Sequence, residues 1–110
     1  MTEVESIELS IQAAKRDKEL RDAVVRLQKN PDFKKVIVEG YFQKEALRLL
    51  ELSANSRLGA DVREDALAEA KATVRLKSYL ETIIQLGNYA ESTDAEREEA
   101  LLDARREETL

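Results

Sequence analysis

One stretch decides the fold of this chain: Asn30-Pro31-Asp32-Phe33-Lys34-Lys35-Val36-Ile37-Val38-Glu39-Gly40-Tyr41-Phe42. Asn30 is a residue type that caps helices, and Pro31 suits a first helical position because its missing amide would have no partner there. Gly40 falls inside the predicted helix, where glycine costs about 1 kcal/mol relative to alanine. We therefore predict a helix that begins at Pro31. We also expect a packing reason for Gly40, such as the close approach of another backbone.

The composition favours an all-α protein and argues against catalysis. The 110 residues are 43% hydrophobic and 37% charged, and they include three glycines and one proline. Cysteine and histidine are absent, which removes disulfides, the commonest metal ligand and the usual general base. We found no phosphate loop, nucleotide-binding glycine pattern or zinc signature. We therefore predict no enzyme activity, no catalytic or metal-binding residues and no cofactor.

The apolar periodicity predicts four helical segments, over about residues 3–28, 31–52, 61–86 and 94–108. Short connections between them favour antiparallel neighbours. The expected fold is an elongated bundle of three long helices plus a shorter acidic C-terminal helix. We divide it into a helical bundle domain at residues 1–90 and an acidic helix or tail at residues 91–110. The apolar spacing shifts too often to predict a sustained coiled coil.

Several residue pairs predict where these helices begin and end. Asp61 with Glu64, and Thr93 with Glu96, have the spacing of a capping box at a helix start. Gly87 followed by a second turn-forming residue, Asn88, is typical of the left-handed turn that ends a helix. We therefore expect the third helix to stop near Leu86.

The net charge of −5 is concentrated at the C-terminal end. Residues 91–110 contain eight acidic residues and three arginines, whereas residues 1–90 are balanced. Such a segment is usually a solvated helix that aids solubility, but it can also dock on a basic partner. The candidate partner-binding acids are Glu98, Glu99, Glu107 and Glu108.

A second candidate partner-binding patch lies near the N-terminus. Val4, Ile7 and Ile11 follow helical spacing and are separated from later apolar residues by the polar stretch 15–19. A bundle this small buries limited apolar area, so a protein partner or a second copy would supply more. We predict a homo-oligomer in which this patch contacts a protein partner.

The aromatic residues leave two questions open. Lys34 and Lys35 lie near Tyr41 and Phe42, a mixture that can mark nucleic-acid contact, but the neutral surroundings make nucleic acid an unfavoured partner. Tyr79 and Tyr89 could anchor an interface. We favour packing beneath the last helix for both tyrosines.

The N-terminus lacks the pattern of a signal peptide, and no stretch approaches the roughly 18 apolar residues of a membrane span. We therefore expect a soluble protein without a membrane partner.

The opening stretch also carries a resemblance. Together with Glu45-Ala46-Leu47-Arg48-Leu49 and Tyr79-Leu80-Glu81-Thr82-Ile83, it resembles a group of small helical proteins encoded by tailed bacteriophages, over about residues 20–86. The resemblance implies a phage protein, encoded among head and tail genes and located in the virion or the host cytoplasm. It brings no defined site.

Two functional hypotheses follow. The first is a non-enzymatic structural or assembly protein that binds capsid, portal or tail components in multiple copies. The alternative is a small acidic phage inhibitor that binds a host protein through its C-terminal helix.

Overall fold

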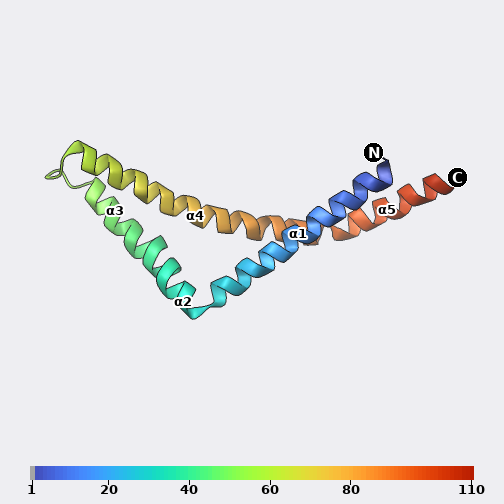
Figure 1. Ribbon diagram of the computed structural model, residues 1–110, viewed down its shortest axis with the longest axis horizontal. Helices are drawn as coiled ribbons and strands as arrows, with labels where there is room; N and C mark the ends of the chain where they lie inside the picture. Colours follow the sequence, from blue (N-terminus) through green and yellow to red (C-terminus); the bar gives the residue numbers. More distant parts are fainter. Residues whose placement is uncertain (1) are drawn as a thin grey trace. The chain divides into compact units, whose positions relative to one another are not determined.

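The computed structural model describes residues 2–110, and these are almost entirely helical, with no strand among them. Figure 1 shows α1 (Glu3–Lys29), α2 (Pro31–Phe33), η1 (Lys34–Glu45), α3 (Ala46–Ser53), α4 (Ala60–Ser92) and α5 (Asp94–Thr109). The elements α2, η1 and α3 follow one another without a break and form one helical stretch. The predicted all-α class, with three long helices and a shorter C-terminal helix, is confirmed.

Asn30 caps the second helical stretch as predicted. Its backbone is extended, with φ −67° and ψ 124°, and its side-chain Oδ1 accepts hydrogen bonds from the amides of Asp32 at 2.9 Å and Phe33 at 3.1 Å. These bonds satisfy two amides that lack a carbonyl partner in the first turn. Pro31 occupies the first helical position, so the start of this helix is decided by two adjacent residues.

The middle of this stretch differs from the predicted α-helix, because the 12 residues of η1 form a π-helix. Its wider turn holds more residues than an α-turn, and the adjacent apolar pairs at 37–38 and 41–42 are all half-buried. A Cβ on Gly40 would meet the Lys35 carbonyl oxygen of the same helix at 3.2 Å. The expected close backbone approach to Gly40 is therefore present, and it comes from the same helix.

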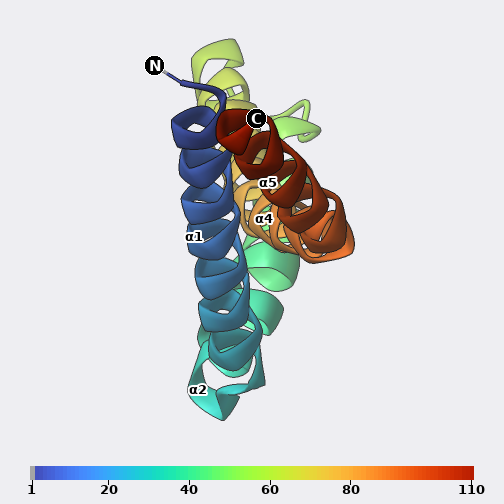
Figure 2. The same ribbon diagram turned by 90° about the vertical axis from the view of Figure 1, so that its right-hand side faces the viewer.

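The chain forms two compact units. Unit 1 comprises the chain up to Val25 together with Thr82–Leu110, and unit 2 comprises Arg26–Glu81. The predicted domain boundary after residue 90 falls inside unit 1. In that unit α5 lies side by side with the first part of α1, as both views show (Figures 1 and 2). The ion pairs of Glu8 with Arg105 and of Lys18 with Asp94 occur in opposite order along α1 and α5, so the two helices are antiparallel neighbours.

Unit 2 is centred on the packing of α3 against the first half of α4. Leu49 of α3 is buried with Ala66 and Ala70 of α4, and Leu52 packs against this cluster. Ala66 and Ala70 are one helical turn apart, so they present a flat, small surface to the leucines. This lets the two helices approach closely.

Unit 1 has a regular seam along α1. The sheltered residues of α1 include a series at alternating spacings of three and four: Val4, Ile7, Ile11, Ala14, Lys18, Arg21 and Val25. Val24, beside the last member of the series, is more buried still. The series has the spacing of a coiled-coil seam, although the apolar repeat itself is interrupted, as the sequence indicated. The apolar pattern concealed it because Lys18 and Arg21 occupy two seam positions.

The predicted helix ends in the C-terminal half also need correction. α4 continues through Gly87 to Ser92, and no described glycine has a positive φ. α4 begins at Ala60, so Asp61 lies in its first turn and is not the cap. Thr93 does precede α5, but its side chain makes no cap hydrogen bond to that helix. Its hydroxyl donates backwards to the Tyr89 carbonyl at 2.9 Å.

Candidate interaction surface

Gly87 allows α1 to lie directly against α4 in unit 1. A Cβ at this position would be 2.2 Å from Cβ of Arg21 and 2.7 Å from its Cδ, so only glycine fits. The Arg21 side chain lies across this gap and is only 12% exposed. Its Nη1 donates to the Gly87 carbonyl at 3.2 Å and to Oε2 of Glu91 at 2.9 Å. Gly87 thus has a packing role rather than the helix-ending role predicted from its type.

Charge pairs connect α1 to the junction of α4 and α5. Nζ of Lys18 donates to Oδ2 of Asp94 at 2.5 Å, and Nη2 of Arg97 donates to Oδ1 at 2.8 Å. These two bonds, that from Lys18 above all, hold the pKa of Asp94 below its usual range. Bonds to Glu91 and Asp22 raise the pKa of Arg21 further, so it stays charged. Because both basic residues lie in the seam, these pairs select one antiparallel register.

The backbone bends at Thr93, between α4 and α5. Thr93 has φ −108° and ψ 5°, outside the α-helical region. Its amide donates to the Tyr89 carbonyl at 3.1 Å, and its own carbonyl accepts from Arg97 at 3.3 Å. The Ala90 carbonyl accepts from the Arg97 guanidinium and, at 3.4 Å, from the Thr93 hydroxyl. Two side chains of the α4–α5 junction therefore bond the same carbonyl of the last turn of α4.

The predicted N-terminal patch lies within the seam of unit 1. Val4, Ile7 and Ile11 are all half-buried, and α5 runs alongside this part of α1. Nη2 of Arg105 donates to Oε1 of Glu8 at 3.1 Å, which fixes α5 over this segment. The premise that the first half of α1 has no intrachain partner is therefore wrong. Its contact with another chain remains a prediction.

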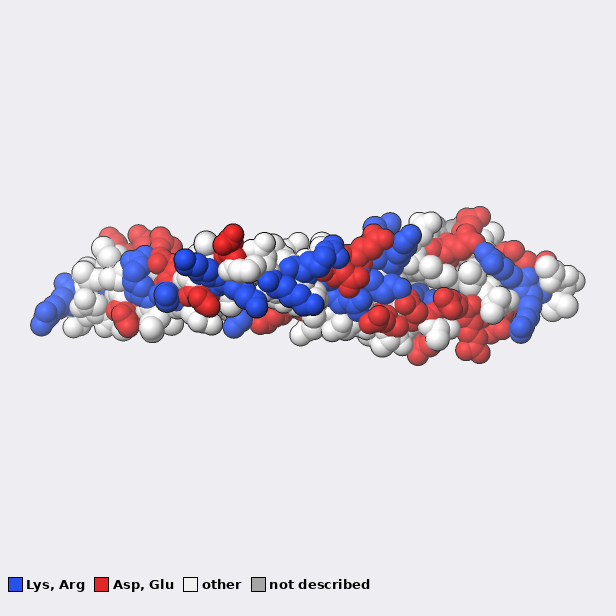
Figure 3. Space-filling model, turned by 90° about the horizontal axis from the view of Figure 1, so that it is seen from below, with Lys and Arg blue, Asp and Glu red and all other residues white. Residues whose placement is uncertain are grey.

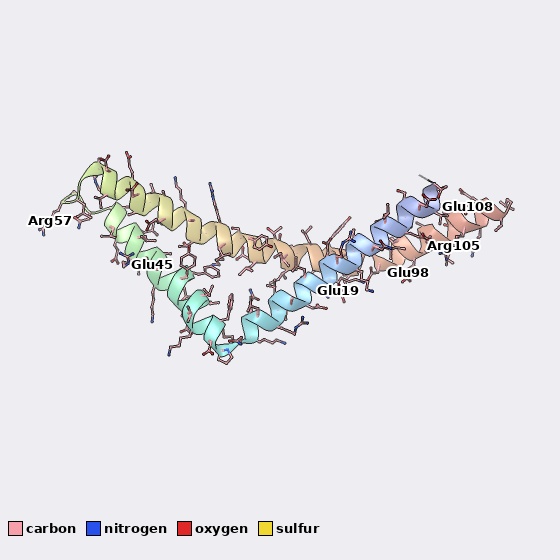
Figure 4. The ribbon with its side chains drawn as sticks, in the orientation of Figure 1. Glu19, Glu45, Arg57, Glu98, Arg105 and Glu108 are labelled. Carbon is pink, nitrogen blue, oxygen red and sulfur yellow. The ribbon has the colours of Figure 1, made fainter. Side chains whose placement is uncertain are left out.

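The predicted acidic residues of α5 lie at the surface, unlike the half-buried N-terminal patch. Glu98, Glu99, Glu107 and Glu108 are all exposed, and none forms an ion pair within residues 2–110. Figure 4 shows Glu98 and Glu108 projecting from α5 near opposite ends of the helix. In Figure 3, acidic side chains gather toward the right-hand end, with basic side chains between them. These carboxylates are free to meet a basic partner.

Both tyrosines of α4 are exposed, so the predicted packing beneath the last helix is wrong. Tyr79 in unit 2 is 59% exposed, and Tyr89 in unit 1 is 67% exposed. Leu86, one turn before Tyr89, is 48% exposed. Tyr41 and Phe42 of η1 are instead half-buried, with ring centroids 5.9 Å apart. Tyr89 and Leu86 are therefore apolar groups available at the surface of unit 1.

Small-molecule and metal sites find little support. Two open hollows in unit 2 have volumes of about 250 and 210 Å³, smaller than typical ligand pockets of at least about 300 Å³. Within residues 2–110 no group of three or more acidic residues is positioned to hold a metal ion.

The sequence patterns did not single out Arg21 and Lys18, and they gave Gly87 a helix-ending role. The sequence does contain evidence for Lys18 and Arg21 as seam residues, because they continue the alternating spacing that begins at Val4. A periodicity analysis that allowed basic residues at seam positions would have identified both. Gly87 acquires its role only when a helix 66 residues earlier in the chain crosses it.

No family model, no curated protein and no solved structure matches this sequence. Among the described helices, none combines the length and apolar character needed to cross a bilayer.

Proposed function

We propose that this protein is a non-enzymatic structural or assembly component of a tailed bacteriophage, which binds capsid, portal or tail proteins in multiple copies. The phage assignment rests on the resemblance of residues 20–86 described above. The binding role rests on one observation: the buried apolar residues are mostly small, whereas large apolar side chains lie outside.

The two sets of residues make this contrast clear. Five of the nine buried hydrophobic residues of the described chain are alanines: Ala14, Ala66, Ala70, Ala90 and Ala104. Tyr79, Tyr89, Val74 and Leu86 are exposed on α4. Aromatic residues are favoured at protein interfaces, and exposed apolar patches mark interaction sites. Association would bury these side chains. It would add apolar buried area, of which the small alanine side chains contribute little.

A protein inventory of purified phage particles tests the proposal. We expect the protein in the particle at a copy number that matches a symmetric assembly, and a light-scattering mass above that of one chain. Absence from particles and from their assembly intermediates, together with a monomeric mass at high concentration, would overturn it.

The four unpaired glutamates of α5 favour one alternative, a small acidic inhibitor that binds a basic surface of a host protein. Reversing Glu98, Glu99, Glu107 and Glu108 to lysine separates the two functions. For the inhibitor, host-protein binding should be lost, and the loss should shrink as salt screens the charges. For the structural component, incorporation into particles should not follow this salt dependence.

A further inference from the structure

We propose that two copies of this chain associate by exchanging α5, with Thr93 as the hinge, so that α5 of each copy packs on α1 of the other. The inference rests on the proposed multi-copy function and specifies the contact that joins the copies. Domain exchange is an inexpensive route to a dimer because each copy reuses contacts it already makes.

The hinge is a single residue. α4 ends at Ser92 and α5 begins at Asp94, so Thr93 alone separates them. Residues 90–96 contain neither glycine nor proline, and nothing in their sequence prevents one continuous helix. Straightening the chain at Thr93 would carry α5 away from the α1 segment of its own copy.

The bent form keeps a local cost that a straight helix would remove. The Ala90 carbonyl accepts hydrogen bonds from the Thr93 hydroxyl and from the Arg97 guanidinium. The Nε of Arg97 is buried with no hydrogen-bond partner, an unfavourable state for a charged group. Straightening the chain at Thr93 would let the Arg97 side chain move so that its Nε reaches water.

The surface that α5 would vacate fits α5 of a second copy. In the closed chain, α5 runs beside the α1 segment that holds the half-buried Val4, Ile7 and Ile11, its buried residue is Ala104, and Glu8 pairs with Arg105. An identical helix from another chain reproduces every one of these contacts. Those three residues, predicted from sequence to meet a partner, would then do so through exchange.

New contacts would form beside the hinge, where the two chains cross. Leu86 and Tyr89 lie within two turns of Thr93 and are 48% and 67% exposed in the single chain. The two copies of these side chains come together only in the exchanged dimer. Burial of exposed aromatic and aliphatic groups there supplies the driving force for association.

Cross-linking distinguishes exchange from other dimers. The chain has no cysteine, so Glu8→Cys with Arg105→Cys creates a defined pair for a short bis-maleimide reagent. The full-length protein is brought to equilibrium at high concentration, and its dimer is isolated before reaction. Exchange predicts covalent dimers on a denaturing gel. Cross-links confined to single chains in an isolated dimer would overturn exchange and leave the proposed function intact, whereas a monomer at every concentration would overturn both.

Hinge variants give a second test. Thr93→Ala and Thr93→Gly both lack the hydroxyl, but alanine favours a continuous helix over glycine by about fivefold per hinge. A dimer contains two hinges, so we expect its dissociation constant to be about 25-fold lower for alanine. Thr109→Ala is the matched control, since the Thr109 hydroxyl also bonds a helical carbonyl, that of Arg106, but at the end of α5. Equal constants for Thr93→Ala and Thr93→Gly would overturn the hinge.

Discussion

Lys18 of α1 and Asp94 of α5 are joined by a hydrogen bond of 2.5 Å, although 76 residues separate them in the sequence. Lys18 lies in the seam of α1, and Asp94 is the first residue of α5, where a negative charge favours helix formation. The pair therefore stabilises the start of α5 and its docking on α1 with one contact.

The first prediction concerns the stability of the protein at low pH. The pKa of Asp94 is lowered in the folded protein, by Lys18 above all. Its stabilising contribution is therefore complete above the unfolded pKa of about 3.9 and is lost as the pH falls below it. Asp94→Asn should lower the melting temperature at pH 7, and its difference from wild type should narrow between pH 4 and pH 2. Glu108→Gln, an exposed site with the same charge change, is the control; a constant Asp94→Asn difference would refute the argument.

The second prediction tests the crossing at Gly87. Gly87→Ala places a methyl group 2.2 Å from Cβ of Arg21, so α1 or α4 must shift. We expect unfolding free energy to fall by about 1 to 3 kcal/mol, as for other overpacked sites. Gly59→Ala meets no atom within 4 Å and should cost less when both are measured by urea denaturation. An unchanged or increased unfolding free energy for Gly87→Ala would show that helix propensity outweighs crowding at this site.

The third prediction asks whether α5 is part of the folded core. Ala104 is 3% exposed, whereas Ala100 of the same helix is exposed. Ala104→Asp buries an unpaired charge and should destabilise the protein by on the order of 3 kcal/mol. Ala100→Asp introduces the same charge into water and should have little effect on thermal melts. Identical melting curves would mean that α5 is not docked in solution.

The fourth prediction concerns the start of the second helical stretch. Asn30→Ala removes an acceptor for two backbone amides and should cost about 1 kcal/mol in unfolding free energy. Asn30→Asp keeps an oxygen in the same place and should retain most of the stability. Chemical denaturation of both variants measures this difference, and equal losses would show that the side-chain oxygen is not the cap.

Features that depend only on residues adjacent in the sequence could be predicted. Asn30 and Pro31 determine a helix start within a single turn, so the local chemistry was sufficient. Gly87 misled the prediction because its type is compatible with a helix end as well as with a close crossing. The choice between them depends on Arg21, which no local pattern places opposite it.

The candidate interaction surface could be predicted only in part, because local sequence patterns do not show which helices meet. The exposed glutamates of α5 follow from a charge run, which needs no tertiary information. The covering of Val4, Ile7 and Ile11 by α5 could not be anticipated, because the apolar residues of α5 form only a weak stripe. Its docking relies on one buried alanine and on two charge pairs, between Arg105 and Glu8 and between Asp94 and Lys18.

The long separation between α1 and α5 has a consequence for synthesis on the ribosome. Glu8 meets Arg105, 97 residues later, so the first half of α1 emerges well before its partner exists. At about 5 to 20 residues per second, that wait lasts roughly 5 to 20 s. Arg26–Glu81 is a continuous segment and is complete earlier, so unit 2 can fold during translation. In a nascent chain, Val4, Ile7 and Ile11 are therefore a transient target for chaperones.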